Sequence, residues 1–190
     1  GYKNAVFDKL KSANISFEKI NDNCLSFSNN EKVSDVINID KEAVIQDYNS
    51  QRIGEFLTSY LPVRQAGIQH RTSNISIWDC CAASGGKSIL AFDLLKKTDI
   101  TVSDTRKNIL ENLKKRFAKA GIRNYHSFIA DLSNSTTLRE TNGKPFFDLI
   151  LSDVPCSGSG TWSRNPEQMN YFSEKSIDNY SILKKKIVSN

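Results

Sequence analysis

The stretch ISIWDCCAASGGKSIL, residues 75 to 90, decides the fold because it joins an apolar strand, a turn of small residues and the start of a helix. Its Gly-Lys-Ser ending resembles that of a nucleotide-triphosphate loop. That loop has the pattern GxxxxGK[ST], which requires a glycine at position 81, and this sequence has Cys81 there. The turn is therefore predicted to serve something other than a phosphate cradle.

The same rhythm of strand and helix continues beyond this stretch. Strands are predicted at 75–79, 99–104, 125–131 and 147–153, and helices at 87–96 and 108–120, the second ended by Gly121. The fourth strand, FDLILSD, has an unbroken apolar run typical of the middle of a sheet. Strands that alternate with helices predict an α/β fold with a mostly parallel sheet and right-handed crossovers.

Each of the four predicted strands ends in an acid: Asp79, Asp104, Asp131 and Asp153. Taken singly, such an acid is expected to cap the helix that follows it. Taken together, the acids lie at the carboxyl ends of parallel strands, where open α/β sheets bind ligands. Together with the glycine turn, this pattern favours a ligand site at that edge.

The glycine turn narrows the chemistry of the ligand. Gly85 and Gly86 would let the backbone approach a ligand and open a helix. A dinucleotide would call for GxGxxG, which is not the spacing here, whereas a ligand with an adenosine and an amino-acid tail suits this turn. S-adenosylmethionine is such a ligand. Its ribose would pair with Asp104 and its adenine amino group with Asp131, with the methyl group pointing to the end of the fourth strand.

The segment DVPCSGSGTWSRNPEQ, residues 153 to 168, follows the fourth strand and places a carboxylate and a thiol beside a stiff Pro155. Asp153 and Cys156 are the candidate catalytic residues; the alternative is a surface turn with an incidental cysteine. Trp162 and Arg164 are candidates for stacking an RNA base and holding its phosphate. Aromatic residues here could equally close the domain core.

The motifs CAASGGKS, VSD, AD and DVPCSGSGTW, in this order and spacing, resemble the RNA cytosine-C5 methyltransferases of the Sun (Fmu, RsmB-like) family. The resemblance covers residues 43 to 172 and includes the upstream QDYNSQ. It implies a Rossmann-like S-adenosylmethionine-dependent methyltransferase domain over residues 46–190, incomplete at its C-terminus. Residues 1–45 are then expected to form part of a small N-terminal α+β RNA-binding module.

The resemblance also assigns roles residue by residue. Asp104 is implied as the ribose ligand and Asp131 as a neighbour of the adenine, while Asp153 and Cys156 lie at the target base. Ser84 departs from the family, which usually has proline there, and we expect cofactor binding to survive this change. The residues implied around the methionine part of the cofactor are Cys81, Ala82, Ala83, Ser84, Gly85, Gly86 and Lys87.

Cytosine C5 is a poor nucleophile, so the reaction requires a thiolate that adds at C6. From the residues alone, Cys156 is the candidate for that thiolate. The resemblance instead implies that the attacking cysteine belongs to a later Thr-Cys motif and that Cys156 assists release. The 190 residues contain no Thr-Cys pair. We therefore expect a fragment that binds the cofactor without completing catalysis alone.

Composition narrows the remaining possibilities. The net charge of +5 mildly favours a polyanionic partner, and 25% charged residues with no long apolar run predict a cytoplasmic protein without a membrane span. Four cysteines without a CxxC pair predict no bound metal. The leading hypothesis is a 16S rRNA cytosine-C5 methyltransferase. A tRNA methyltransferase and a non-catalytic RNA-binding protein that retains the fold stay open, and the sequence does not indicate the oligomeric state.

Overall fold

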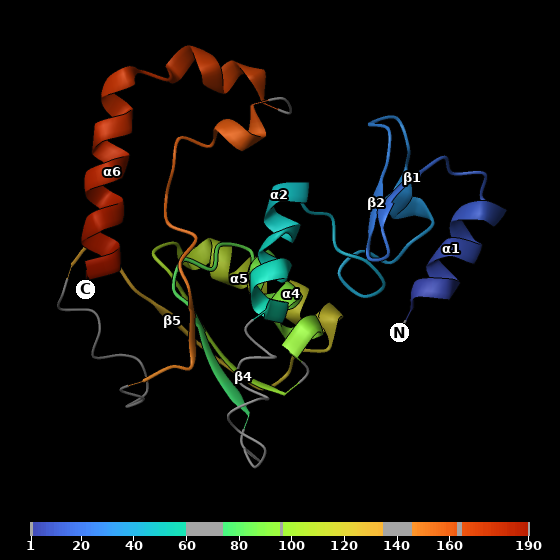
Figure 1. The fold of residues 1–190 in the computed structure, drawn as a ribbon, viewed down its shortest axis with the longest axis horizontal. Helices are drawn as coiled ribbons and strands as arrows, with labels where there is room; N and C mark the ends of the chain where they lie inside the picture. Colours follow the sequence, from blue (N-terminus) through green and yellow to red (C-terminus); the bar gives the residue numbers. More distant parts are fainter. Residues whose placement is uncertain (1, 60–73, 96, 135–145, 163–164, 190) are drawn as a thin grey trace. The chain divides into compact units, whose positions relative to one another are not determined.

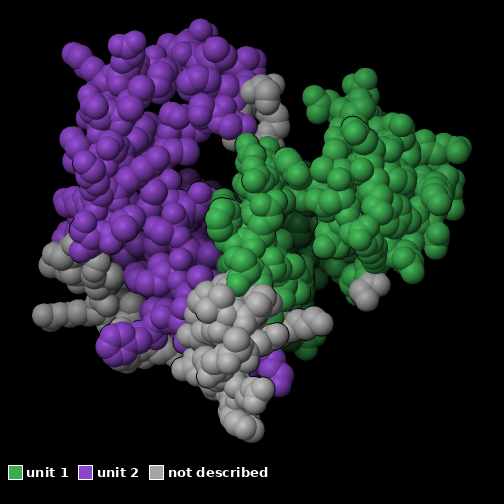
Figure 2. All heavy atoms as spheres, viewed as in Figure 1, with its two compact units in different colours: residues 1–70, 85–96, 112–123 green, residues 71–84, 97–111, 124–190 purple. Residues whose placement is uncertain are grey.

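The computed structural model describes residues 2–59, 74–95, 97–134, 146–162 and 165–189 (Figure 1). Its contacts divide the chain into two compact units (Figure 2). Unit 1 comprises residues 1–70, 85–96 and 112–123, and unit 2 comprises residues 71–84, 97–111 and 124–190. The sheet with its carboxyl edge belongs to unit 2.

Unit 1 begins with helix α1 (Lys3–Ser12) and an antiparallel hairpin of β1 (Glu18–Asn21) and β2 (Cys24–Ser26), followed by the short 3-10 helix η1 (Val33–Asp35). These elements have a small core of their own. Its buried members are Val6, Leu10 and Ile37, and the partly buried residues around it are Ile15, Phe17, Leu25, Phe27, Val33, Val36, Ile39 and Ala43. The expected α+β character of this segment is therefore present.

The described residues of unit 1 also include several helices. These are α2 (Tyr48–Gln51), a further helix over residues 53–59, α4 (Gly86–Leu95) and the second half of α5 (Lys107–Ala120). An ion pair connects α5 to the N-terminal segment, because Arg116 donates to the Oδ1 atom of Asp40 from Nε at 2.9 Å and from Nη2 at 2.8 Å. Both side chains are largely buried.

The end of α5 follows the sequence prediction. Gly121 has a left-handed φ of +80°, and the next residue, Ile122, donates its N–H to the carbonyl of Phe117 at 2.9 Å. This bond spans six residues and is the closing bond of a Schellman motif, which favours glycine at the left-handed position. Gly121 therefore ends the helix as predicted.

Unit 2 is built on a four-stranded sheet in the order β5-β4-β3-β6, with β3 at Ile75–Asp79, β4 at Thr98–Asp104, β5 at Tyr125–Ile129 and β6 at Leu149–Leu151. Every neighbouring pair is parallel. The last five residues of β4 are all buried, as expected for a strand covered on both faces. The predicted parallel α/β sheet is confirmed, but β6, which was predicted for the middle of the sheet, lies at an edge of the described sheet.

The strand order reverses beside β3. The chain passes from β3 to β4 and β5 on one side and then returns to place β6 on the other side of β3. Asp79, at the end of β3, lies in register with Val102 of β4 and Leu151 of β6. The turn that follows Asp79 is therefore at the topological switch point, the place where open α/β sheets bind ligands.

Two strands are shorter than predicted. β5 ends at Ile129 and β6 at Leu151, so Asp131 and Asp153 lie two residues beyond their strands. In the first case the ladder reaches Ala130, whose N–H donates to the Asp104 carbonyl at 3.2 Å, and Asp131 then enters a turn. The carboxyl edge is still the edge from which both acids emerge.

The C-terminal part of unit 2 contains the 3-10 helices η3 (Ser159–Thr161) and η4 (Pro166–Tyr171) and the helix α6 (Glu174–Ser189). α6 has no fully buried residue, but Ile187 packs against a core cluster at the sheet. The buried members of that cluster are Trp78, Cys80, Ala130 and Leu132. Among the described residues, none of the helices has both the length and the apolar character needed to cross a bilayer.

Candidate functional site

The turn after β3 is held by backbone bonds to both neighbouring strands. Cys80 donates its N–H to the carbonyl of Leu151 at 3.0 Å, and Ala82 donates to the carbonyl of Ser103 at 2.9 Å. Ala83 then adopts a left-handed φ of +46°, and its N–H donates to the Asp104 Oδ2 atom at 3.0 Å. The turn therefore presents a backbone donor directly to the acid at the end of β4.

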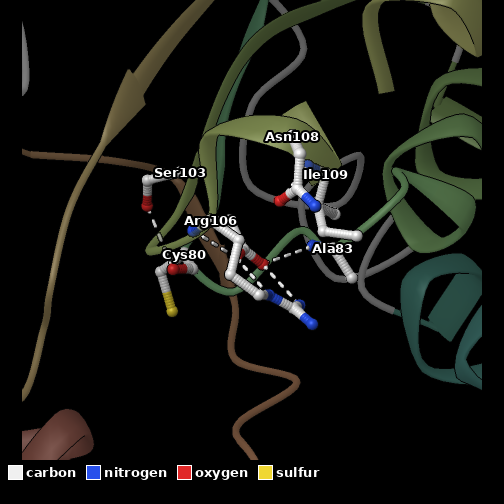
Figure 3. A network of polar contacts seen from close by, with 7 residues as sticks. Cys80, Ala83, Ser103, Arg106, Asn108 and Ile109 are labelled. Atoms are coloured by element: carbon white, nitrogen blue, oxygen red, sulfur yellow. Dashed lines mark hydrogen bonds and ion pairs between the residues drawn. The ribbon is translucent and has the colours of Figure 1, made fainter. Parts of the chain in front are cut away.

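Asp104, at the end of β4, accepts hydrogen bonds from Ala83 and Arg106, which are both labelled in Figure 3. Its Oδ1 atom accepts bonds from the backbone N–H and the Nε of Arg106, both at 3.0 Å, and its Oδ2 atom accepts from Ala83 and from the Nη2 of Arg106 at 3.2 Å. Burial raises the pKa of Asp104, yet the bonds from Arg106 and Ala83 outweigh it, and the pKa lies below its ordinary value. Asp104 is therefore a buried but ionised carboxylate.

A buried side-chain relay fixes the strands under the turn. The indole Nε1 of Trp78 donates to Ser103 Oγ at 3.1 Å, and Ser103 Oγ donates to the carbonyl of Cys80 at 3.0 Å. The three residues come from β3, β4 and the turn, so the relay connects adjacent strands at their carboxyl ends. Sequence reasoning missed Trp78 and Ser103, because their roles depend on strand register. It also missed Arg106, which lies two residues after Asp104.

The two glycines of the turn belong to unit 1, where they open α4. Gly85 has a left-handed φ of +82°, and a Cβ there would lie 2.7 Å from the Phe117 ring. A Cβ at Gly86 would lie 3.2 Å from Gln46 Nε2. Within unit 1, the left-handed backbone and the close packing against Phe117 thus explain the glycine at position 85. Its predicted approach to a ligand stays a prediction, as do the roles of Ser84 and Lys87.

The adjacent thiols of the turn differ in environment. Cys80 is buried and donates to Ser152 Oγ at 3.5 Å, while Cys81 is half-buried. The hydrogen bond between Cys81 and Cys80 raises the pKa of the Cys81 thiol. Burial and the nearby Asp104 and Asp79 carboxylates raise this pKa further. Cys81 is therefore a neutral thiol at pH 7, which suits a lining residue better than a nucleophile.

Asp131 is exposed and held in a local turn. Its Oδ1 atom accepts from the backbone N–H of Ser133 at 2.9 Å and from Ser133 Oγ at 2.6 Å. These bonds lower the pKa of Asp131, and the positive charge of Lys186 on α6 acts in the same direction. Asp131 is thus an ionised acceptor at the carboxyl edge, one strand away from Asp104.

Asp153 and Cys156 lie on the exposed loop that follows β6. The N–H of Gly158 donates to the Cys156 sulfur at 3.5 Å, and Gly158 has a left-handed φ of +72°. The loop therefore turns back toward the thiol and leaves it accessible to solvent. β6 is the strand beside the switch point, which places this loop next to the turn after β3 in the sheet order.

Of the two candidate RNA contacts, Trp162 is described and Arg164 lies outside the described residues. The Trp162 ring meets Phe172 edge to face at a centroid distance of 5.1 Å. Its buried Nε1 has no acceptor within the described part of the chain. An RNA contact by Trp162 and the alternative that aromatic residues close the core here both stay predictions.

The described residues contain no group of three or more His, Cys, Asp or Glu side chains arranged to hold a metal ion.

The fold has counterparts among solved structures. The crystal structure of PH0851 matches 98% of this chain and 40% of its own, with a TM-score of 0.76 and 22% identity. NSun6 from Pyrococcus horikoshii, solved with SFG, matches 76% of this chain and 33% of its own, with a TM-score of 0.53 and 18% identity. The chain has a Rossmann-like fold.

Sequence comparison gives the family. The model of the 16S rRNA methyltransferase RsmB/F family matches residues 68–190, and the chain belongs to this family. The probable ribosomal RNA small subunit methyltransferase B of Bacillus subtilis is 34% identical over 96 residues, which are 50% of this chain and 21% of that protein. The human tRNA (cytosine(72)-C(5))-methyltransferase NSUN6 is 30% identical over 120 residues, 58% of this chain and 25% of that protein. The matched region thus spans about a fifth to a quarter of these relatives.

Proposed function

We propose that the chain is the cofactor-binding part of an S-adenosylmethionine-dependent RNA cytosine-C5 methyltransferase. The observation that carries the proposal is the ionised, buried Asp104 at the switch point of the sheet, fixed by the N–H of Ala83. Family membership supports the same reading.

The residues of the edge fit an adenosyl ligand. Asp104 offers two carboxylate oxygens to a ribose diol, Asp131 offers acceptors to an adenine amino group, and both carry the charge that makes them acceptors only. The left-handed Ala83 turns its N–H toward the same acid. The cofactor would supply a methyl group on a positively charged sulfur, and the ionised carboxylates favour a cationic ligand.

Asp153 and Cys156 are proposed to act at the target base. Asp153 would hydrogen-bond the cytosine N3 and N4 edge and stabilise the charge that develops as a thiolate adds at C6. After methyl transfer, Cys156 would accept the proton from C5, the C5–C6 double bond would re-form, and the C6–sulfur bond to the attacking cysteine would break, which releases the methylated cytosine. The accessible thiol on a loop beside the switch point suits this task.

Two kinds of RNA are candidates for the substrate. Relatives named as rRNA methyltransferases include the Bacillus subtilis protein and the 28S rRNA (cytosine-C(5))-methyltransferase of mouse, and NSUN6 is named as a tRNA methyltransferase. We favour rRNA because the family model that matches most of the chain is that of the 16S rRNA enzymes.

The cofactor proposal is tested by isothermal titration calorimetry of the 190-residue chain with S-adenosylhomocysteine. Saturable binding is expected, and Asp104→Ala should abolish it. Asp104→Asn is the second test variant, because it keeps the shape of the side chain and removes its charge. Asp178→Ala, an exposed acid on α6, is the matched control and should bind normally. No binding by the folded wild-type chain at millimolar ligand would refute the proposal.

The chemical proposal needs a second measurement. With radiolabelled S-adenosylmethionine and ribosomal RNA, the 190-residue chain should bind cofactor without labelling RNA, because it has no Thr-Cys pair. Label transfer by this chain that is lost in Cys156→Ser would instead make Cys156 the attacking thiol.

A further inference from the structure

The carboxylate of Asp104 is saturated with hydrogen bonds. Each oxygen accepts two donors, one from the backbone and one from the Arg106 guanidinium. A carboxylate has about four acceptor positions, so the described contacts occupy all of them. Nothing further can bind Asp104 side-on unless one pair of donors leaves.

The two pairs of donors differ in how readily they can leave. The backbone N–H groups of Ala83 and Arg106 are fixed by the turn and by the start of α5, where the Arg106 carbonyl accepts from Ile109 at 3.2 Å and Leu110 at 3.3 Å. The Arg106 side chain is 57% exposed, whereas that of Asp104 is 6% exposed. The guanidinium can therefore move into solvent, while the carboxylate and its backbone donors stay in place.

Removal of the guanidinium would open one acceptor position on each oxygen. The Nε and Nη2 atoms form a two-pronged fork, bonding Oδ1 and Oδ2 respectively. A vicinal diol presents two hydroxyl donors in a similar arrangement. The guanidinium thus occupies the positions that a ribose would need, and the remaining N–H groups would hold the carboxylate in the orientation to receive it.

We propose that Arg106 sets the affinity of this site for ribose-containing ligands: its guanidinium occupies the diol positions of Asp104 and must be exchanged for the ribose hydroxyls. The inference rests on the proposed function, in which Asp104 binds the ribose of an adenosyl ligand. Ligand binding then requires the open state, in which Arg106 has left Asp104. The observed affinity is the affinity of that state multiplied by the fraction of molecules that occupy it.

The test compares ligand binding by the wild-type chain, Arg106→Ala and Arg106→Gln. S-adenosylhomocysteine carries no net charge at pH 7.5 and is the calorimetric probe. Both variants should bind it about 1.5- to 5-fold more tightly, a range set by what a half-exposed ion pair contributes. Arg123→Ala removes an equally charged, exposed side chain and should leave the affinity unchanged.

Two further readouts separate exchange from a general structural effect. Raising KCl from 50 to 500 mM should tighten binding to the wild-type chain, because salt weakens the ion pair, and should not do so for Arg106→Ala. In NMR titrations, Arg106→Ala should gain affinity for adenosine but not for 2′,3′-dideoxyadenosine, which has no diol to exchange.

The outcomes are distinguishable from failure of the proposed function. If no variant binds any adenosyl ligand although circular dichroism shows folded protein, the proposed function fails and the inference fails with it. If the wild-type chain binds and both Arg106 variants bind equally or more weakly, Arg106 is not exchanged and only the inference is overturned. A gain for dideoxyadenosine equal to that for adenosine would also overturn it.

Discussion

Substitution of Gly85 by alanine should destabilise the chain more than the same change at Gly121. Both glycines have left-handed φ angles, +82° and +80°. They differ in surroundings. A Cβ at Gly85 would lie 2.7 Å from Phe117 Cε1 and 3.0 Å from Leu113 Cγ, whereas nothing lies within 4 Å of a Cβ at Gly121.

The magnitude follows from two effects. The left-handed conformation costs a non-glycine residue roughly 1–2 kcal/mol at either position. At Gly85 the added methyl group must also displace Phe117 and Leu113, which are 0% exposed. Overpacking of this kind costs about 1–3 kcal/mol. We therefore expect a loss of about 1–2 kcal/mol for Gly121→Ala and about 2–5 kcal/mol for Gly85→Ala.

Urea denaturation followed by circular dichroism measures both losses, read as midpoint shifts at constant slope. Phe117→Leu in the Gly85→Ala background should recover part of the loss, because it removes the ring atom nearest to the new methyl group, and a double-mutant cycle would show this coupling. Equal losses at the two glycines, or no coupling with Phe117, would refute the packing explanation of Gly85.

Three other predictions concern charged groups. The pKa of Asp104 in the folded chain lies below 3.8, so its contribution to stability is complete above its ordinary pKa and is lost as the pH falls through the folded-state pKa. Asp104→Asn should therefore reduce the loss of stability seen in denaturation curves as the pH falls from 6 to 2. Arg116→Ala should cost about 2 kcal/mol of unfolding free energy, since it strands the largely buried Asp40 carboxylate, and Asp40→Asn in the same chain should recover part of it. Ser133→Ala should raise the pKa of Asp131 in an NMR titration, because the side-chain bond that lowers it most is lost; an unchanged pKa would show that the backbone bond alone sets it.

The sheet could be predicted from sequence because its signals are local. Apolar runs, the glycine after α5 and the alternation of strands with helices each fall within a few residues of the feature they specify. The ends of β5 and β6 were placed two residues too late because Asp131 and Asp153 looked like the last residues of their strands. A strand ends where its pairing with the neighbouring strand stops, and this pairing is not a local property of the sequence.

The contacts of the site could not be predicted in the same way. The bond from Ala83 to Asp104 joins residues 21 positions apart, and that from Trp78 to Ser103 joins residues 25 positions apart. Each depends on the register of β3 against β4, which the sequence pattern leaves open. Arg106 is a different case, since it lies only two residues from Asp104, yet an exposed arginine beside an acid at a helix start gives no distinctive signal.

Stability and ligand binding place opposite demands on Asp104, and Arg106 reconciles them. A carboxylate that is 6% exposed is costly without a counter-charge, and the guanidinium supplies one. The same contact occupies the acceptor positions that a ribose requires. Because Arg106 is itself half exposed, its pair with Asp104 is weak enough to be broken by a ligand and strong enough to compensate the charge when no ligand is bound. Loss of Arg106 should thus lower the stability of the free chain and raise its affinity for the ligand. These opposite effects on stability and affinity are expected only where one side chain occupies the place of the ligand.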